Sequence, residues 1–129
     1  MILLDTQALL WLAQVPEMLS EKAASAISEA RRHNGVAIAD KTLWEIAMLI
    51  SRKRIGIKTP LRDFLKEVEH YCTVLPITAE VAERAVQFSE RFPKDPTDRI
   101  IGATAIVHGL SLVTSDKLIR ASGEVECIW

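Results

Sequence analysis

The sequence predicts an α/β fold of three layers, in which helices cover both faces of a central, mostly parallel sheet of four to five strands. Short apolar runs alternate along the chain with longer segments whose apolar residues have helical spacing. Strands separated by helices pair in parallel, and such sheets are buried between helical layers. With 129 residues, 49% of them hydrophobic, we expect one domain over residues 1–129 with a single core.

Five short apolar runs predict the strands. Each has four or five residues, is mostly aliphatic, and is bounded by polar or turn-forming residues. Their length favours strands over helices. In chain order, the predicted strands are residues 1–4, 36–39, 73–77, 111–114 and 125–129.

Six longer segments between these runs predict helices. Several have recognisable ends: Ser20 is suited to cap a helix that Gly35 terminates, and Thr78 opens another with Glu80 in its first turn. The helix that should hold LWEIAMLI is apolar nearly all round, which predicts packing on two sides. In chain order, the predicted helices are residues 6–13, 20–33, 41–54, 60–71, 78–91 and 96–109.

The charge balance excludes a polybasic nucleic-acid-binding protein. Sixteen basic and seventeen acidic residues give a formal net charge of −1. Any contact with RNA or DNA would therefore depend on local patches. Two basic runs at predicted helix ends, where the helix dipole also favours cations, are candidates: Arg31, Arg32 and His33, and then Arg52, Lys53 and Arg54.

Other common sites and signals have no support in the sequence. Cys72 and Cys127 are too far apart for a CxxC motif and too few for a disulfide framework, so we expect the reducing cytoplasm. The apolar start of the chain has no basic leader and is interrupted by Asp5, so we expect neither a signal peptide nor a membrane helix.

Phosphate-loop and dinucleotide motifs are absent. Three histidines lack zinc-site spacing: His33, His70 and His108.

Four acidic residues are placed to meet at one edge of the predicted sheet. Asp5 and Asp116 follow the carboxyl ends of two strands, Glu45 follows the second strand, and Asp98 opens a helix. Each alone has a structural explanation, since the aspartates suit helix caps or turns and Glu45 has Arg52 two turns along. Together, the carboxylates would repel one another unless a cation neutralised them. Their oxygens suit Mg²⁺ or Mn²⁺, which can activate water for phosphodiester hydrolysis.

The segment KDPTDR is typical of a helix start. Asp95 is placed as the N-cap, Pro96 as the first helical residue and Asp98 three residues past the cap, close to a capping box. Small residues follow, which predict a helix packed close to the sheet so that Asp98 reaches the crevice: Gly102, Ala103 and Ala105.

Four segments in one order carry a resemblance to a known family: LLDTQALLW, LWEIA, DPTDRIIGATA and LVTSDKLIR. Together they resemble the PIN-domain ribonucleases of the VapC toxin type, over nearly the whole chain. The resemblance implies a PIN-like nuclease domain that acts as a metal-dependent endoribonuclease, the toxin of a type II toxin–antitoxin pair. It also implies a Mg²⁺ cofactor, an RNA substrate, a homodimer and a small VapB-like antitoxin.

The resemblance also assigns roles to residues. It implies that Asp5, Asp98 and Asp116 lie nearest the metal, with Glu45 in the same cluster, directly or through water. Three further residues are expected to support the site, with a direct metal role left open for the last, whose expected role is capping: Thr6, Thr114 and Asp95.

This chain departs from the family pattern at the expected rim of the site. Many relatives carry a histidine before DPxDR and a phenylalanine at x, whereas this chain has Phe92, Pro93 and Lys94 before the motif and Thr97 within it. Lys41 stands where relatives often carry small residues. Three apolar residues are available for partner contacts or for core packing: Trp11, Trp44 and Met48.

Three alternatives fit the sequence less well. A receiver-like signalling domain would have paired acids after the first strand and a lysine after the last full strand, but Asp5 stands alone. A haloacid-dehalogenase-like phosphatase would have an aspartate at position 7, which is Gln7. A catalytically silent PIN-like binding domain would use every acid as a cap, which leaves Glu45 unexplained.

Overall fold

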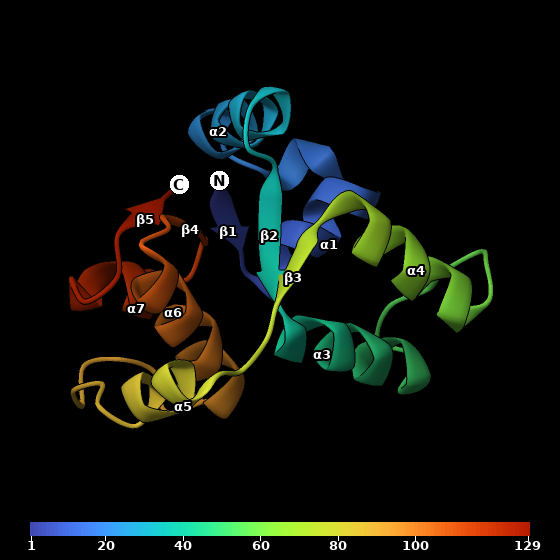
Figure 1. Cartoon of the computed structure of the whole chain (residues 1–129). Coiled ribbons are helices and arrows are strands. Elements are labelled where there is room, and N and C mark those ends of the chain that lie inside the picture. Colours follow the sequence, from blue (N-terminus) through green and yellow to red (C-terminus); the bar gives the residue numbers. More distant parts are fainter.

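Five parallel strands form the centre of the structure, a computed structural model that describes residues 1 to 129 (Figure 1). Along the chain the elements are β1 (Ile2–Leu4), α1 (Thr6–Gln14), the 3-10 helix η1 (Pro16–Met18), α2 (Glu21–Arg32), β2 (Val36–Ala39), α3 (Asp40–Ser51), α4 (Leu61–Tyr71), β3 (Thr73–Leu75), α5 (Ala79–Ala85), α6 (Pro96–His108), β4 (Leu112–Val113), α7 (Lys117–Ser122) and β5 (Cys127–Ile128).

The sheet has the order β3-β2-β1-β4-β5, and every pair is parallel. Strand β1 lies at the centre, with β2 on one side and β4 on the other. The carboxyl ends of all the strands therefore lie along one edge, and the order reverses at β1, where open α/β sheets form their ligand crevice. The predicted three-layer fold with a parallel sheet is confirmed.

The sheet divides the expected single core into two, because successive side chains of a strand point to opposite faces. Leu3, Ala37 and Leu112 belong to a core cluster covered by α5, α6 and α7. Their neighbours Leu4 and Val113 belong to a second cluster covered by α1, α2, α3 and α4. Figure 1 shows these two groups of helices on opposite sides of the sheet. None of the helices is both long and apolar enough to span a bilayer.

Most element boundaries differ from the prediction by a few residues. Strands 73–77 and 125–129 are shorter in the structure, at Thr73–Leu75 and Cys127–Ile128. The helix predicted over 41–54 covers Asp40–Ser51 instead, because Lys53 takes the left-handed conformation, with φ 57°, and ends it. Two short elements, η1 and α7, were not predicted, since three and six residues carry too little periodicity.

The helix predicted over 78–91 is the largest error, because α5 ends at Ala85. The residues after it form turns whose carbonyl groups are bound by a distant side chain. Arg99 Nε donates to the Pro93 carbonyl (2.8 Å), and Arg99 Nη2 donates to those of Phe92 (3.4 Å) and Ser89 (3.5 Å). Directly after Ala85 the backbone closes tight turns instead, in which the Val86 N–H donates to the Glu83 carbonyl (3.3 Å) and the Gln87 N–H to that of Arg84 (3.1 Å). The Arg99 bonds depend on tertiary structure, so local periodicity does not indicate them.

Gly102 allows two phenylalanine rings to pack on α6. The rings of Phe88 and Phe92 are stacked, with centroids 3.9 Å apart, and both are buried. A Cβ atom on Gly102 would lie 2.8 Å from Phe92 Cζ and 3.0 Å from Phe88 Cζ. The small side of α6 at Gly102 therefore accommodates the two rings. Ala103 and Ala105 do belong to the core cluster that includes β1 and β2 residues.

We predict that Gly102→Ala destabilises the protein by about 1 kcal/mol, because overpacking the buried ring pair outweighs the better helix propensity of alanine. Urea unfolding of both proteins measures the change. Gly56→Ala is the matched control, since nothing lies within 4 Å of a Cβ at Gly56. A Gly102→Ala protein as stable as the unmodified chain would contradict this packing argument.

Candidate active site

Four carboxylates from four elements influence one another at the carboxyl edge of the sheet. Asp5 caps α1, Glu45 lies in α3, Asp98 is in the first turn of α6, and Asp116 caps α7. Asp116 and Glu45 both raise the pKa of Asp5, and all three raise that of Asp98. The structure does not, however, gather three Asp, Glu, His or Cys side chains closely enough to form a ready metal-binding group. The metal-ligand roles therefore stay a prediction.

Asp5 is buried and held by both neighbouring elements. Its backbone N–H donates to the Val113 carbonyl of β4 (3.1 Å), and the Ala8 N–H donates to its Oδ1 (2.7 Å). Burial raises the pKa of Asp5 to about 6, although hydrogen bonds from Thr114 and Ala8 lower it. Asp5 is thus a helix cap and also a buried carboxyl group with a raised pKa.

Asp98 and Asp95 have separate roles at the start of α6. Asp95 Oδ1 accepts the N–H groups of Thr97 (2.8 Å) and Asp98 (3.2 Å), so the predicted cap is confirmed. The Asp98 side chain takes no part in this cap and is half-buried. Burial raises the pKa of Asp98 to about 7, and Asp95, Asp116, Glu45 and Asp5 raise it further in that order of effect.

Thr114 connects two of the acids. It is fully buried at the end of β4, where its hydroxyl lowers the pKa of Asp5, and its Oγ1 accepts the Asp116 N–H (3.1 Å). Asp116 Oδ1 in turn accepts the N–H groups of Leu118 and Ile119, each at 2.9 Å. The hydroxyl therefore sets the spacing between the two caps.

Two polar residues near the carboxyl end of β2, Asp40 and Thr42, were not identified from the sequence. The hydroxyls of Thr6 and Thr42 are buried and hydrogen-bonded to each other (3.2 Å), which ties α1 to α3. Asp40 follows β2 as Asp5 follows β1; its Oδ2 accepts the Ile77 N–H (3.0 Å), and its buried Oδ1 has no partner. The position of Asp40 directly after a buried strand was the signal that could have indicated it.

The two basic runs have different environments. Arg32 and His33 both contact Glu29 of their own helix, at 3.6 Å and 2.9 Å, and the Arg31 guanidinium lies over the Tyr71 ring. The second run follows the end of α3, makes no ion pair and is exposed: Arg52, Lys53 and Arg54. Only the second run presents free cations.

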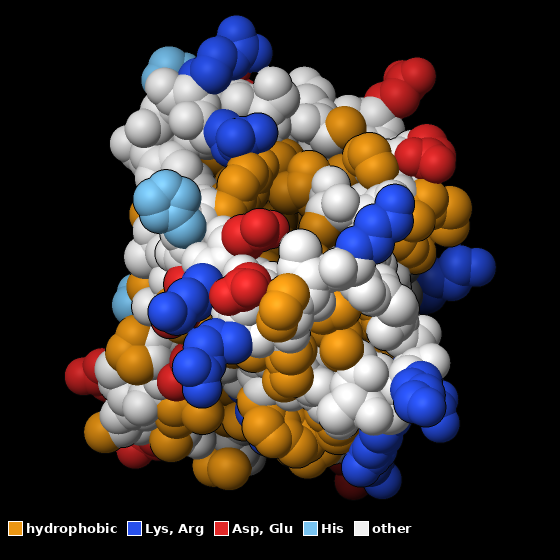
Figure 2. All heavy atoms as spheres, turned by 90° about the vertical axis from the view of Figure 1, so that its right-hand side faces the viewer, with side chains coloured by type: hydrophobic (Ala, Val, Ile, Leu, Met, Phe, Trp, Pro, Cys, Tyr) orange, Lys and Arg blue, Asp and Glu red, His pale blue; other side chains and the backbone are white.

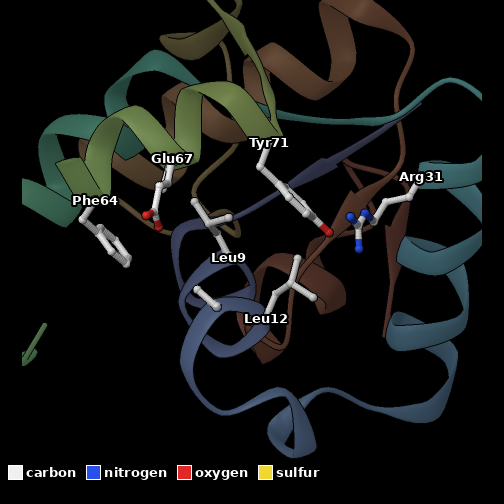
Figure 3. Close-up of a pocket in the computed structure, with 8 residues that line it drawn as sticks. Leu9, Leu12, Arg31, Phe64, Glu67 and Tyr71 are labelled. Carbon is white, nitrogen blue, oxygen red and sulfur yellow. The ribbon is translucent and has the colours of Figure 1, made fainter. Parts of the chain in front are cut away.

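An apolar groove lies between α1, α2 and α4. A cavity of about 340 Å³ is lined by Leu9, Leu12, Phe64 and Tyr71, with Arg31 and Glu67 at its border (Figure 3). A second cavity of about 460 Å³ shares Leu12, Arg31 and Tyr71 with the first. The Tyr71 hydroxyl is buried without a hydrogen-bond partner. Figure 2 shows hydrophobic side chains gathered on this side of the molecule beside basic and acidic ones.

Comparison with known proteins settles the family. The family model described as the PIN domain matches residues 2–124. The chain belongs to the PIN domain family. It is also 37% identical over 120 residues to Ribonuclease VapC22 of Mycobacterium tuberculosis, covering 93% of this chain and 90% of that protein.

Solved structures support the PIN fold. The chain is similar to VapBC2 from Rickettsia felis bound to a promoter DNA fragment, with a TM-score of 0.76, 16% identity, and 98% and 97% of the two chains covered. It is also similar to a toxin–antitoxin complex from Klebsiella pneumoniae, with a TM-score of 0.67, 22% identity, and 97% and 95% covered. The predicted resemblance to VapC-type PIN domains is thereby confirmed.

The donor set of this PIN domain fits a hard divalent cation. Its candidate ligands are carboxylates, and no cation of the chain pairs with them. The raised pKa values of Asp5 and Asp98 indicate a site that lacks positive charge. A divalent cation would remove this deficit.

We predict that Asp98→Asn stabilises the metal-free protein at high pH. Between the ordinary value of 3.8 and the raised values of about 6 and about 7, the folded chain binds more protons than the unfolded chain. The free energy of unfolding therefore falls as the pH rises through this window. Removing the Asp98 charge should restore on the order of 1 kcal/mol at about pH 8, because solvent screens a half-buried group.

Thermal unfolding in a chelator at about pH 4 and about pH 8 measures this effect. The Asp98→Asn gain should appear only at the higher pH, and Asp63→Asn, an exposed aspartate of α4, should show no gain. Equal stability of the unmodified and Asp98→Asn proteins at the higher pH would contradict electrostatic coupling of the acids.

Proposed function

We propose that this PIN domain is an endoribonuclease that hydrolyses RNA phosphodiester bonds with Mg²⁺, or Mn²⁺ in its place, as the toxin of a type II toxin–antitoxin pair. The observation that carries the proposal is the pair of aspartates Asp5 and Asp98, whose pKa values are raised first by burial and then by the nearby acids Asp116 and Glu45. The 37% identical relative is named a ribonuclease, which supports RNA as the substrate.

Four acids would hold the metal: Asp5, Asp98 and Asp116 directly, and Glu45 directly or through water. When bound, the ion would supply Lewis acidity and lower the pKa of water for attack on phosphorus. The chain itself holds the carboxylates in place. The N–H groups of α1 and α7 fix one oxygen each of Asp5 and Asp116, and Thr114 Oγ1 accepts the backbone N–H of Asp116.

Supporting residues would position the acids and the RNA. Thr6 fixes the start of α1 through Thr42, and Asp95 fixes the start of α6 as its cap. The three exposed cations after α3, Arg52, Lys53 and Arg54, would bind RNA phosphates, because they make no ion pair within the chain.

We further propose a small VapB-like antitoxin as partner, a homodimer as the working unit, and the cytoplasm as the location. The groove of α1, α2 and α4 supports a peptide partner, since it offers apolar walls, one cation and a buried tyrosine hydroxyl without a partner. Cys72 and Cys127 are free thiols, in keeping with a reducing compartment.

One alternative keeps support from a specific observation. A catalytically silent PIN domain would bind without hydrolysis, and the absence of three closely gathered ligands in the metal-free chain is what favours it. The receiver-like alternative has no such support, because the chain belongs to the PIN domain family.

We predict that purified, partner-free protein cleaves RNA only with Mg²⁺ or Mn²⁺, leaving 5′-phosphate and 3′-hydroxyl ends. Asp5→Asn and Asp98→Asn should each lower the rate by about 100-fold or more, because each removes a metal ligand. Asp95→Asn keeps the cap and should retain most of the activity. Cleavage of labelled total RNA on gels, with end-group analysis, measures these rates.

The same measurement separates the alternatives. Absence of cleavage by the intact protein would favour the silent PIN domain. Equal residual activity in the Asp5→Asn and Asp98→Asn variants and the intact chain would remove the proposed site. A loss in Asp95→Asn as large as in Asp98→Asn would assign Asp95 to the metal as well.

For the partner, we predict that Tyr71→Phe weakens binding of the antitoxin encoded beside the gene by about fivefold, the value of one hydrogen bond. Leu12→Arg should abolish binding by placing a charge in the apolar groove. Both variants should still cleave RNA. Calorimetric titration measures the affinities, and unchanged affinity in both variants would place the antitoxin elsewhere.

A further inference from the structure

Trp44 of α3 is the one aromatic side chain among the exposed large hydrophobic residues of the chain, with 54% of its surface accessible. The other two tryptophans, Trp11 and Trp129, contact each other with ring centroids 5.7 Å apart and are partly buried. An exposed ring on a helix of the candidate site is available to stack on a ligand.

Lys41 lies directly over this ring. Its Nζ is 4.1 Å from the centroid of Trp44, a cation–π contact one turn along α3. Glu45 is four residues from Lys41, yet the two form no ion pair. The lysine thus restrains the indole and keeps a positive charge beside the ring.

The pair lies near the start of α3, which begins directly after β2 at the carboxyl edge of the sheet. Glu45 of the same helix is close enough to Asp5 and Asp98 to raise the pKa of both. On the same side of the helix, Arg52 follows Glu45 by seven residues, a rise of about 10 Å. An RNA strand bound at the acids would therefore contact the Trp44 ring and the Lys41 ammonium together. Two turns further along the helix it would reach Arg52 and the cations that follow it.

We propose that Trp44 and Lys41 form a nucleotide clamp, in which the indole stacks on an unpaired RNA base next to the cleaved phosphate and Lys41 binds the adjoining phosphate. This inference rests on the proposed ribonuclease function. Aromatic rings beside cations are the usual way in which proteins bind single-stranded nucleic acid, because every base has a π-face and every nucleotide a charge.

A second copy of the chain fits this surface less well. The centres of protein interfaces are depleted of lysine and glutamate, whereas Trp44 stands between Lys41 and Glu45 along α3. The cations at the far end of the helix also match a polyanion. Self-association through Trp44 is consequently an outcome for the test to detect.

The test measures the affinity of a fluorescein-labelled single-stranded RNA of mixed sequence by anisotropy, with Mg²⁺, in an Asp98→Asn background that prevents cleavage. Trp44→Ala should raise Kd about tenfold, and Trp44→Phe should keep most of the affinity. Lys41→Ala should lower the slope of log Kd against log salt concentration by about 0.7, while Lys41→Arg should restore it. Met18→Ala is the matched control, because Met18 is 50% exposed on η1.

The outcomes are distinct from those of the nuclease test. A Trp44→Ala affinity within twofold of the background protein's overturns the clamp even if the intact chain cleaves RNA. A tenfold loss supports the clamp even if the intact chain never cleaves RNA. Sedimentation of the same proteins without RNA detects the alternative: a dimer that Trp44→Ala converts to monomer assigns the ring to a second copy and overturns the clamp.

Discussion

Burial of carboxylates at one edge of a parallel sheet, with their mutual repulsion added to it, is the constraint on which the site depends. A parallel sheet brings the ends of β1, β2 and β4 to one edge, and acidic residues follow each of these ends or open a helix there. Burial then removes the water that would screen them. The result is visible in the pKa values of Asp5 and Asp98, raised to about 6 and about 7. The folded chain therefore holds an unfavourable arrangement that a divalent cation would make favourable.

Helix N-termini make this arrangement tolerable. Asp5, Asp95 and Asp116 each accept backbone N–H groups of the helix that they cap, which offsets part of the repulsion. Asp98 does not cap a helix, and its pKa is raised furthest. Capping and metal binding are thus compatible, since a carboxylate has two oxygens and a helix end can occupy one. The same geometry explains why a sequence reading cannot separate the two roles.

The sequence predicted what depends on local pattern and missed what depends on distant partners. Alternation of short apolar runs and helical segments was sufficient for the parallel sheet, and residues directly after strands were sufficient to nominate Asp5 and Asp116. The turns after α5 could not be predicted, because Arg99 binds their carbonyls from six to ten residues later in the chain. Thr42 was missed because its role is a single hydrogen bond to the Thr6 hydroxyl of another helix, which no spacing in the sequence indicates. Asp40 alone had a readable signal, its position after β2.

Helix α1 connects the acidic edge of the sheet, where it begins after Asp5, with the apolar groove of α1, α2 and α4. Its first turn is held by Asp5 and by the Thr6–Thr42 pair, and its later turns present Leu9 and Leu12 to the groove. An occupant of the groove would therefore contact a helix whose start carries a candidate metal ligand. Helix α3 is likewise bound to α1 on one side and free on another. Its Thr42 hydroxyl bonds to Thr6 of α1, whereas its Trp44 ring is exposed to solvent. One buried hydroxyl pair thus joins the helix proposed to bind a protein partner with the helix proposed to bind RNA.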